Sequence, residues 1–270
     1  MPCLAGTESQ ILAHGELFDG GGDGWLLRGA DTLAGVLLGN GGALADESCQ
    51  LYRQMFAITR GLNRYRIWNY VPRINAMVDG VENYVAFNAG RHRAFAEQFG
   101  NIAAQDLSAA SAVGVAGGPL AVAFVAGSDP VRNYENPLQT PASRYPARYG
   151  ENAPLFARGS KVHATDGRTC WHLSGTASIR ESETIGSDFA RQFHITLENI
   201  TGLLADMAVP AVRQAAWKIF LRDRKDLGVC QQLMAAAYPE EVPQMVFLEA
   251  DICRSDLLLE IEGVFHQVPP

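Results

Sequence analysis

Two carboxylates near the C-terminal end of the sequence have the spacing for acid–base chemistry. In the segment Asp256–Gly263, a β-strand would place Glu260 and Glu262 on one face, because side chains alternate across a sheet. If both are buried, their charges repel, and one of them keeps its proton near neutral pH. A protonated carboxylic acid is the group that cleavage of an enol ether requires. The alternative interpretation places both glutamates on a solvated outer face of the sheet.

A loop in the middle of the chain gathers positive charge. Its cations and aromatic side chains are Arg144, Arg148, Arg158, Tyr145, Tyr149 and Phe156. Guanidinium groups bind carboxylates in a bidentate manner, and tyrosines add hydroxyl donors. Because the net charge of the chain is −7, an anionic substrate needs a local group of cations. The cluster predicts a site for a small carboxylate or phosphate, and the alternative is an exposed loop that binds nothing.

Two further residues are candidates on weaker grounds. Arg91 follows Gly90 within a predicted helix, where a glycine marks a kink or a close approach of two backbones. An exposed helical arginine is the alternative. Cys253 precedes Arg254, and a neighbouring cation can lower the pKa of a thiol. A buried structural cysteine is the alternative there.

Several kinds of site are excluded by pattern. The stretch Gly20–Gly24 is not followed by the Lys and Ser or Thr of a phosphate-binding loop. The six histidines form no HxH or HxxxH pair and the five cysteines form no CxxC pair. We therefore expect no metal, no disulfide framework and no cofactor. His172, which lies in an apolar segment, is interpreted as a core residue.

Composition narrows the partners and the compartment. The acidic balance argues against a nucleic-acid partner. The longest apolar stretch, Leu120–Ala126, is too short to span a bilayer, and Met1–Gln10 lacks the pattern of a secretory leader. We expect a cytoplasmic protein that binds a small molecule and no membrane.

Hydrophobic periodicity predicts the elements that position these residues. In the second half, strands are expected at Cys170–Ile179, Ala215–Leu221, Met245–Ile252 and Leu257–Phe265, with helices at Ser187–Met207 and Asp226–Ala237. The first half repeats helix and strand at Glu47–Arg60, Arg64–Tyr70, Gly80–Phe99 and Leu120–Ala126. The pattern indicates an α+β fold of two related lobes, residues 1–132 and 159–270, whose helices cover one face of each sheet. Residues 133–158 form the loop between the lobes, and loops of this length are usually functional.

An ordered series of motifs resembles the chorismatase family, whose members remove pyruvate from chorismate. The motifs are Ile67-Trp-Asn-Tyr70, Gly90-Arg91, Asn136-Pro-Leu-Gln139, Arg144-Tyr-Pro146, Tyr149-Gly150, Phe156-Ala-Arg158, Ser174-Gly-Thr-Ala-Ser178, Asp251-Ile-Cys-Arg254 and Leu259-Glu-Ile-Glu-Gly263. The resemblance spans about residues 60–265. The C-terminal lobe is also similar to the RidA/YjgF fold, but it lacks the arginine that imine-deaminating members carry before the penultimate strand. Met1–Asp46 is shorter than in the family and matches no known pattern.

The resemblance implies a role for individual residues. Glu260 would protonate the enolpyruvyl methylene carbon, and Tyr145, Arg158 and Arg91 would hold substrate oxygens. The pocket would be lined by Gly175, Ala177 and Cys253. A cysteine at position 253 is typical of hydroxybenzoate-forming members, whereas Ala177 is typical of the hydrolases.

We expect 3-hydroxybenzoate as the product, with 4-hydroxybenzoate as a second product to consider. The alternatives are a hydrolase that gives a dihydroxycyclohexadiene carboxylate, a RidA-like imine deaminase, and a ligand-binding protein without catalysis. A monomer or a small homo-oligomer is expected.

Overall fold

The computed structural model describes residues 1–5, 16–19, 24–29, 31–165, 167–211 and 213–267. Its first sheet has six strands in the order β2-β3-β4-β9-β5-β8. Their bounds are β2 Glu16–Asp19, β3 Trp25–Arg28, β4 Thr32–Leu38, β5 Asn63–Pro72, β8 Ala109–Val115 and β9 Ala121–Gly127. Helices α1 (Leu44–Ile58) and α2 (Asn83–Phe99) cover one face of this sheet.

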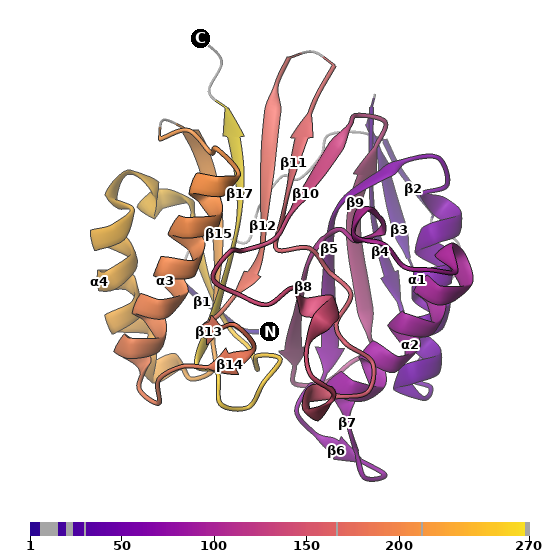
Figure 1. The fold of residues 1–270 in the computed structure, drawn as a ribbon, viewed down its shortest axis with the longest axis horizontal. Coiled ribbons are helices and arrows are strands. Elements are labelled where there is room, and N and C mark those ends of the chain that lie inside the picture. The colour runs from indigo at the N-terminus through magenta and orange to yellow at the C-terminus, as the bar shows by residue number, and fades with distance from the viewer. Residues whose placement is uncertain (6–15, 20–23, 30, 166, 212, 268–270) are drawn as a thin grey trace.

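The second sheet has seven strands in the order β1-β16-β15-β17-β12-β11-β10. Their bounds are β1 Cys3–Ala5, β10 Val131–Tyr134, β11 Gly159–His163, β12 Thr169–Thr176, β15 Arg213–Leu221, β16 Met245–Glu249 and β17 Leu259–Gln267. Helices α3 (Phe189–Asp206) and α4 (Leu227–Ala237) cover its outer face. Figure 1 therefore shows four layers, with both helical layers outside and the two sheets facing each other.

The two lobes share one topology. The order β4-β9-β5-β8 in the first sheet corresponds to β12-β17-β15-β16 in the second. In each lobe the single parallel pair, β5 with β8 and β15 with β16, is joined through a helix. The predicted α+β class, with helices on one face of each sheet, is confirmed.

The sheets do not divide the chain at one residue. Strand β1, at the very start of the chain, pairs with β16 of the second sheet. Strand β10 pairs with β11 of the same sheet, although it lies at the junction of the expected first lobe and the loop. The two edge strands of the second sheet, β1 and β10, therefore come from before the expected second lobe.

Local sequence explains the helices that pack on the sheets. The apolar stripe of α3 includes Phe193, Ile200 and Leu204, which are buried. The helix is capped by Asp188, which accepts from the Arg191 amide and lies one residue after the expected start at Ser187. At Gly90 a Cβ would lie 1.9 Å from the carbonyl oxygen of Ala45, so the glycine permits the close approach of α1 and α2.

Several strands lacked a sequence signal. In the two large sheets, the strands that were not predicted are β1 to β4, β8, β10 and β11. Strand β8 (AASAVGV) consists of small residues and is buried largely on both faces, so neither alternation nor bulky side chains mark it. The first 46 residues, which matched no pattern, supply three strands of the first sheet and one of the second. The glycine-rich stretch Gly20–Gly24 lies mostly outside the described residues.

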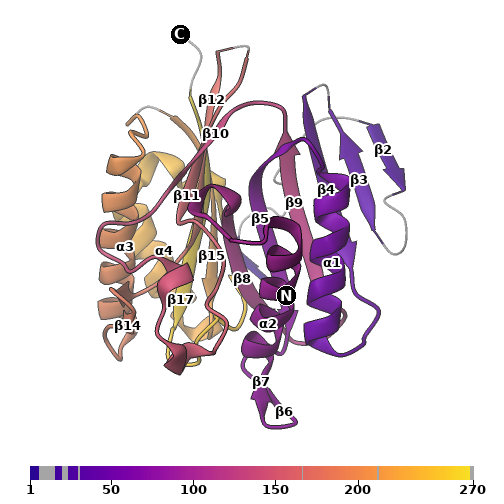
Figure 2. The same ribbon diagram turned by 45° about the vertical axis from the view of Figure 1, so that its right-hand side comes forward.

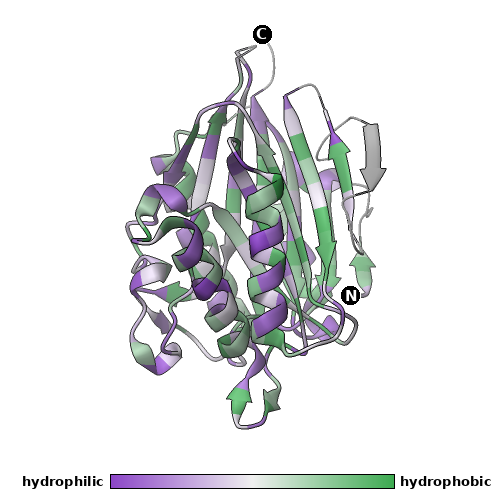
Figure 3. Cartoon of the chain, turned by 90° about the vertical axis from the view of Figure 1, so that its right-hand side faces the viewer, coloured by the Kyte–Doolittle hydropathy of each residue, from purple (hydrophilic) through white to green (hydrophobic). Residues whose placement is uncertain are grey.

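A small hairpin, β6 (Met77–Val78) with β7 (Val81–Glu82), projects from the body of the molecule (Figure 1), and part of its ribbon has the green of hydrophobic residues in Figure 3. The side chains of Met77, Val78 and Val81 are exposed. Within the described part of the chain, no helix is long and apolar enough to cross a membrane.

Candidate active site

A cavity of about 380 Å³ lies at the seam between the lobes. All seven residues to which the family resemblance assigns a role line it, namely Arg91, Tyr145, Arg158, Gly175, Ala177, Cys253 and Glu260. They come from α2, the 133–158 segment, β12 and the residue that follows it, the β16–β17 loop and β17. The 133–158 segment crosses the seam in Figure 2 and forms part of the wall. The volume lies in the range of a small-molecule site.

Glu260 lies in the wall of this cavity as a buried acid. Strand β17 turns Leu259 and Ile261 toward the helices and turns Glu260 toward the first lobe, as the alternation predicted. The side chain is buried, and its Oε1 has no hydrogen-bond partner among the described residues. Burial and the nearby Glu262 raise the pKa of Glu260 to about 8, although Arg66 and Arg158 act in the opposite direction. Glu260 therefore carries a proton at neutral pH.

Glu262 points the same way but has a different environment. Its carboxylate forms ion pairs with Arg66 (2.7 Å) and Lys218 (3.2 Å) and accepts from the Trp68 indole (2.8 Å). Burial alone would raise the pKa of Glu262, but Lys218, Arg66 and the hydrogen bonds hold it below its ordinary value. The solvated-face alternative is wrong for both glutamates, because the first lobe covers that face.

Gly175 fixes the space that Glu260 occupies. A Cβ on this residue would lie 1.9 Å from Glu260 Oε1 and 2.5 Å from Cδ. The Gly175 amide donates to the hydroxyl of Ser111 on β8, at 2.8 Å. Only glycine allows the strand and the acid to approach this closely.

The arginines of the 133–158 segment separate into different environments. Arg158 is buried and donates to the Tyr145 hydroxyl at 2.6 Å and to the Thr140 carbonyl at 3.3 Å. Arg148 lines the cavity but pairs with Glu183 at the surface. Arg144 does not line the cavity, so the expected cluster of three is reduced to one buried cation and one at the mouth.

Arg91 is buried in α2, so the exposed alternative is wrong. It donates to the carbonyl of Leu155, and its guanidinium lies 5.1 Å from the ring centroid of Tyr52. Ring contacts of this kind, together with the carbonyl, stabilise a charge that no carboxylate neutralises in this cavity.

Cys253 is half-buried near Glu260, and desolvation raises the pKa of its thiol to about 12. The expectation that Arg254 would lower the pKa of the thiol is wrong in its net effect. Arg254 does act in that direction, but burial and Glu260 prevail. Cys253 is therefore a neutral wall residue.

Arg254 itself belongs to the cavity, which sequence reasoning did not propose. It lies 3.8 Å from the ring centroid of Tyr149 and donates to the carbonyl of Ser182 at 2.8 Å. Ser111 was also missed, since the strand that carries it has no pattern. Arg66 could have been found from the sequence, because it stands two residues before Trp68 on one face of a buried strand.

Buried donors without partners indicate what the cavity can bind. Among the described residues, Arg91 Nε, Arg158 Nε and Arg254 Nη2 are buried and lack hydrogen-bond partners. Buried donors of charged groups are rarely left unsatisfied in a folded protein. Three such cations around one neutral acid suit an organic anion with more than one carboxylate. Within the described part of the chain, no group of His, Cys, Asp and Glu could hold a metal ion.

Comparisons with known proteins point in the same direction. Residues 22–126 match the family described as chorismatase FkbO/Hyg5-like, N-terminal. A chorismatase of Streptomyces hygroscopicus is 32% identical over 258 residues, which cover 90% of this chain and 74% of the relative. A 3-hydroxybenzoate synthase of the same organism is 36% identical, over 74% of this chain and 62% of the relative.

A crystal structure of chorismatase at 1.08 Å resolution is similar over most of the fold. The TM-score is 0.79 at 31% sequence identity, and the match covers 89% of this chain and 76% of the other.

Proposed function

The chain belongs to the chorismatase family, and from that premise we propose that it converts chorismate to 3-hydroxybenzoate and pyruvate, with Glu260 as the catalytic acid. Membership makes the chain an enzyme that acts on chorismate. The observation that supports the finer proposal is a neutral carboxylic acid, Glu260, in one cavity with three arginines that each have a buried donor without a hydrogen-bond partner among the described residues.

The proposed reaction begins with transfer of the Glu260 proton to the methylene carbon of the enolpyruvyl group. The carbon–carbon double bond supplies the electron pair, and an oxocarbenium centre forms at the adjacent carbon. The carbon–oxygen bond at the ring then breaks and pyruvate leaves with the ether oxygen, while the oxygen of the neighbouring ring hydroxyl moves to the ring carbon that lost the ether. Loss of one ring proton restores aromaticity and returns a proton to Glu260, so the two products together contain all the atoms of chorismate. In the alternative hydrolytic reaction, one water is consumed and a dihydroxycyclohexadiene carboxylate leaves with pyruvate.

The arginines of the cavity bind the substrate in this proposal. Chorismate carries two carboxylates, and Arg158 with Tyr145 offers donors on one wall of the cavity while Arg91 and Arg254 offer them on others. A charge-assisted hydrogen bond in such a dry site is stronger than its counterpart in water. The substrate would also hold the reacting carbon next to Glu260, which lowers the entropic part of the barrier.

The direct test is an assay of purified protein with chorismate, coupled to lactate dehydrogenase so that released pyruvate oxidises NADH. Chromatography of the same mixture then identifies the aromatic or diene product. Absence of pyruvate from folded protein would reject the proposal. Pyruvate accompanied only by the diene diol would reject the product and keep the acid mechanism.

Removal of the buried arginine should weaken substrate binding. We expect Arg158→Ala to raise KM by about 30- to 150-fold, which corresponds to roughly 2–3 kcal/mol for a lost charged hydrogen bond in a buried site. Steady-state kinetics of pyruvate release measure this change. Arg144→Ala is the matched control, because this arginine of the same segment does not line the cavity. An unchanged KM for Arg158→Ala would exclude Arg158 from substrate binding.

The residues that line the cavity beside Glu260 should influence which product forms more than they influence the rate of pyruvate release. Cys253 and Ala177 both line the cavity, and both are uncharged there. We expect Cys253→Val, a change of similar volume, to alter the ratio of hydroxybenzoate to diene diol while pyruvate release continues. Chromatography of products at equal pyruvate yield is the measurement. An identical product ratio would remove Cys253 from product control.

A further inference from the structure

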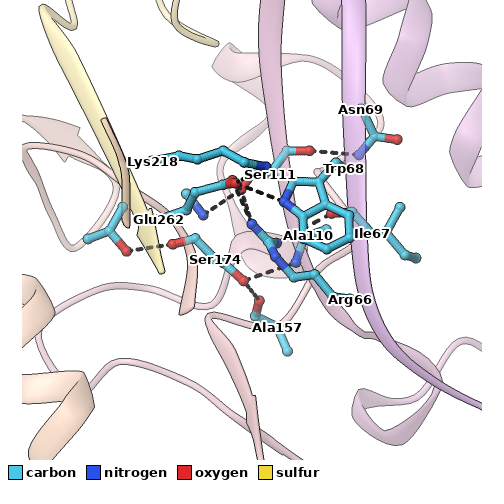
Figure 4. A network of polar contacts seen from close by, with 12 residues as sticks. Arg66, Ile67, Trp68, Asn69, Ala110, Ser111, Ala157, Ser174, Lys218 and Glu262 are labelled. Carbon is cyan, nitrogen blue, oxygen red and sulfur yellow. Dashed lines mark hydrogen bonds and ion pairs between the residues drawn. The ribbon is translucent and has the colours of Figure 1, made fainter. Parts of the chain in front are cut away.

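Glu262 has a set of contacts that extends across both lobes (Figure 4). From the first lobe, Arg66 and Trp68 on β5 and Ser111 on β8 reach its carboxylate. From its own lobe, Lys218 on β15 does so. Four donors therefore converge on two oxygens, and both side chains of the Arg66–Glu262 pair are almost fully buried, at 1% and 4% exposure.

The hydrogen bonds around Ser111 define the charge state of Glu262. The Ser111 hydroxyl accepts from the Gly175 amide and from Arg66, so its own proton is directed to Glu262 Oε2 at 2.5 Å. The other oxygen of the carboxylate faces the Trp68 N–H and the Lys218 ammonium. A proton on either oxygen would face a donor. Glu262 is therefore held as a carboxylate.

The state of Glu260 depends on this arrangement. The titratable and charged groups that face Glu260 are Glu262, Arg66, Arg158, Cys253 and Tyr84. Burial raises the pKa of Tyr84 and of Cys253, so both stay neutral. Arg66 and Arg158 are the cations that favour an ionised Glu260, and Arg66 is paired with Glu262. Lys218, with Tyr70 beside it, balances the remaining charge of Glu262.

We propose that Glu262 is a positioning residue that occupies Arg66 and thereby keeps Glu260 protonated, so that the working acid exists only where the two lobes are docked. This inference rests on the proposed function for its meaning, because it explains how the acid is loaded with a proton at neutral pH. It assigns Arg66, Trp68 and Ser111 of the first lobe to a site whose acid belongs to the second. None of these residues needs to touch the substrate.

The decisive variant is Glu262→Gln, which keeps the shape but removes the charge. Arg66 then lacks its counter-ion, and Glu260 ionises to replace it. In wild-type protein, kcat/KM should fall as pH rises through about 8, because this ratio reports on the acid of the free enzyme. In Glu262→Gln we expect the fall to occur at a pH at least about one unit lower, as an adjacent unpaired cation produces.

A matched control separates charge from damage at the seam. Ser174 accepts from the Ala110 amide and donates to the Ala157 carbonyl, and it lies in the same region (Figure 4) without a charged partner. Ser174→Ala should leave the pH of the fall unchanged. If Glu262→Gln only lowers kcat at every pH, as Ser174→Ala would by loosening the seam, the inference is overturned.

A second measurement does not depend on catalysis. In protein labelled with 13C at the glutamate carboxyl carbon, the Glu260 signal is identified by its absence from Glu260→Gln. In wild-type protein we expect Glu260 to titrate near pH 8 and Glu262 to remain ionised far below that pH. The reverse assignment would overturn the inference even if chorismate is cleaved, and the expected assignment would support it even if chorismate is not the substrate.

Discussion

Glu260→Gln is expected to abolish pyruvate release from chorismate while leaving the fold and the cavity intact. Glu260 is neutral in the folded protein, so glutamine replaces a neutral group by a neutral group of nearly the same shape. The amide cannot supply the proton, and general acid catalysis is worth about 10²–10⁴-fold, so a loss of at least that size should appear in kcat. The coupled assay measures the rate, and equilibrium binding of a benzoate product analogue serves as the control for an intact site.

The same variant, which should lose activity, is expected to be more stable than wild type near neutral pH. The raised pKa of Glu260 means that the folded protein favours the protonated form. At a pH below the ordinary pKa of a glutamate, both the folded and the unfolded chain hold the proton, so burial of the acid does not reduce the free energy of unfolding. As pH rises from there through about 8, the unfolded chain gains stability by ionising and wild-type protein loses stability. Glu260→Gln should therefore unfold at higher denaturant concentration than wild type at pH 7 to 8, and at a similar one near pH 4. Wild-type turnover in this variant would remove Glu260 from the mechanism.

Gly175→Ala is expected to lower kcat by on the order of 10²-fold, because misplacement of a reacting group by about 1 Å has effects of that size. The added Cβ would lie 1.9 Å from Glu260 Oε1, so the carboxyl group must rotate or shift. Since the clash falls on the end of a flexible side chain, the backbone can stay in place and the protein should still fold. The measurement is kcat for pyruvate release, together with thermal unfolding.

A second glycine provides the control for this prediction. At Gly228 in α4 a Cβ would meet nothing within 4 Å. Gly228→Ala should therefore leave kcat unchanged and stabilise the helix by up to about 1 kcal/mol. Full activity in Gly175→Ala would mean that the acid works from more than one position, and would contradict the close packing described for it.

Local pattern was sufficient for the parts of the site that lie close together in the chain. The two-residue period of a strand placed Glu260 and Glu262 on one face, and the structure confirms that they share it. The helical period gave α3 its buried stripe. Gly90 was interpreted as a kink or a close approach of backbones, and the structure shows the close approach, with α1 as the partner. The ordered motifs gave the family, which the comparisons confirm. Strands of small residues, such as β8, were missed because burial on both faces leaves no alternation to detect.

Spacing and composition could not choose between equivalent residues; the family resemblance named Glu260 and Arg158, and only the tertiary structure gives the physical reason. Local pattern could not say which glutamate keeps its proton, because the groups that decide it, Arg66 and Trp68, lie 196 and 194 positions before Glu262. Nor does local pattern explain why Arg158 is buried while Arg144 stands outside the cavity. Protonation and charge depend on burial and on the distance to other charges. The burial of a group and its distance to other charges are determined where strands from the two lobes meet. A local sequence pattern does not predict that contact.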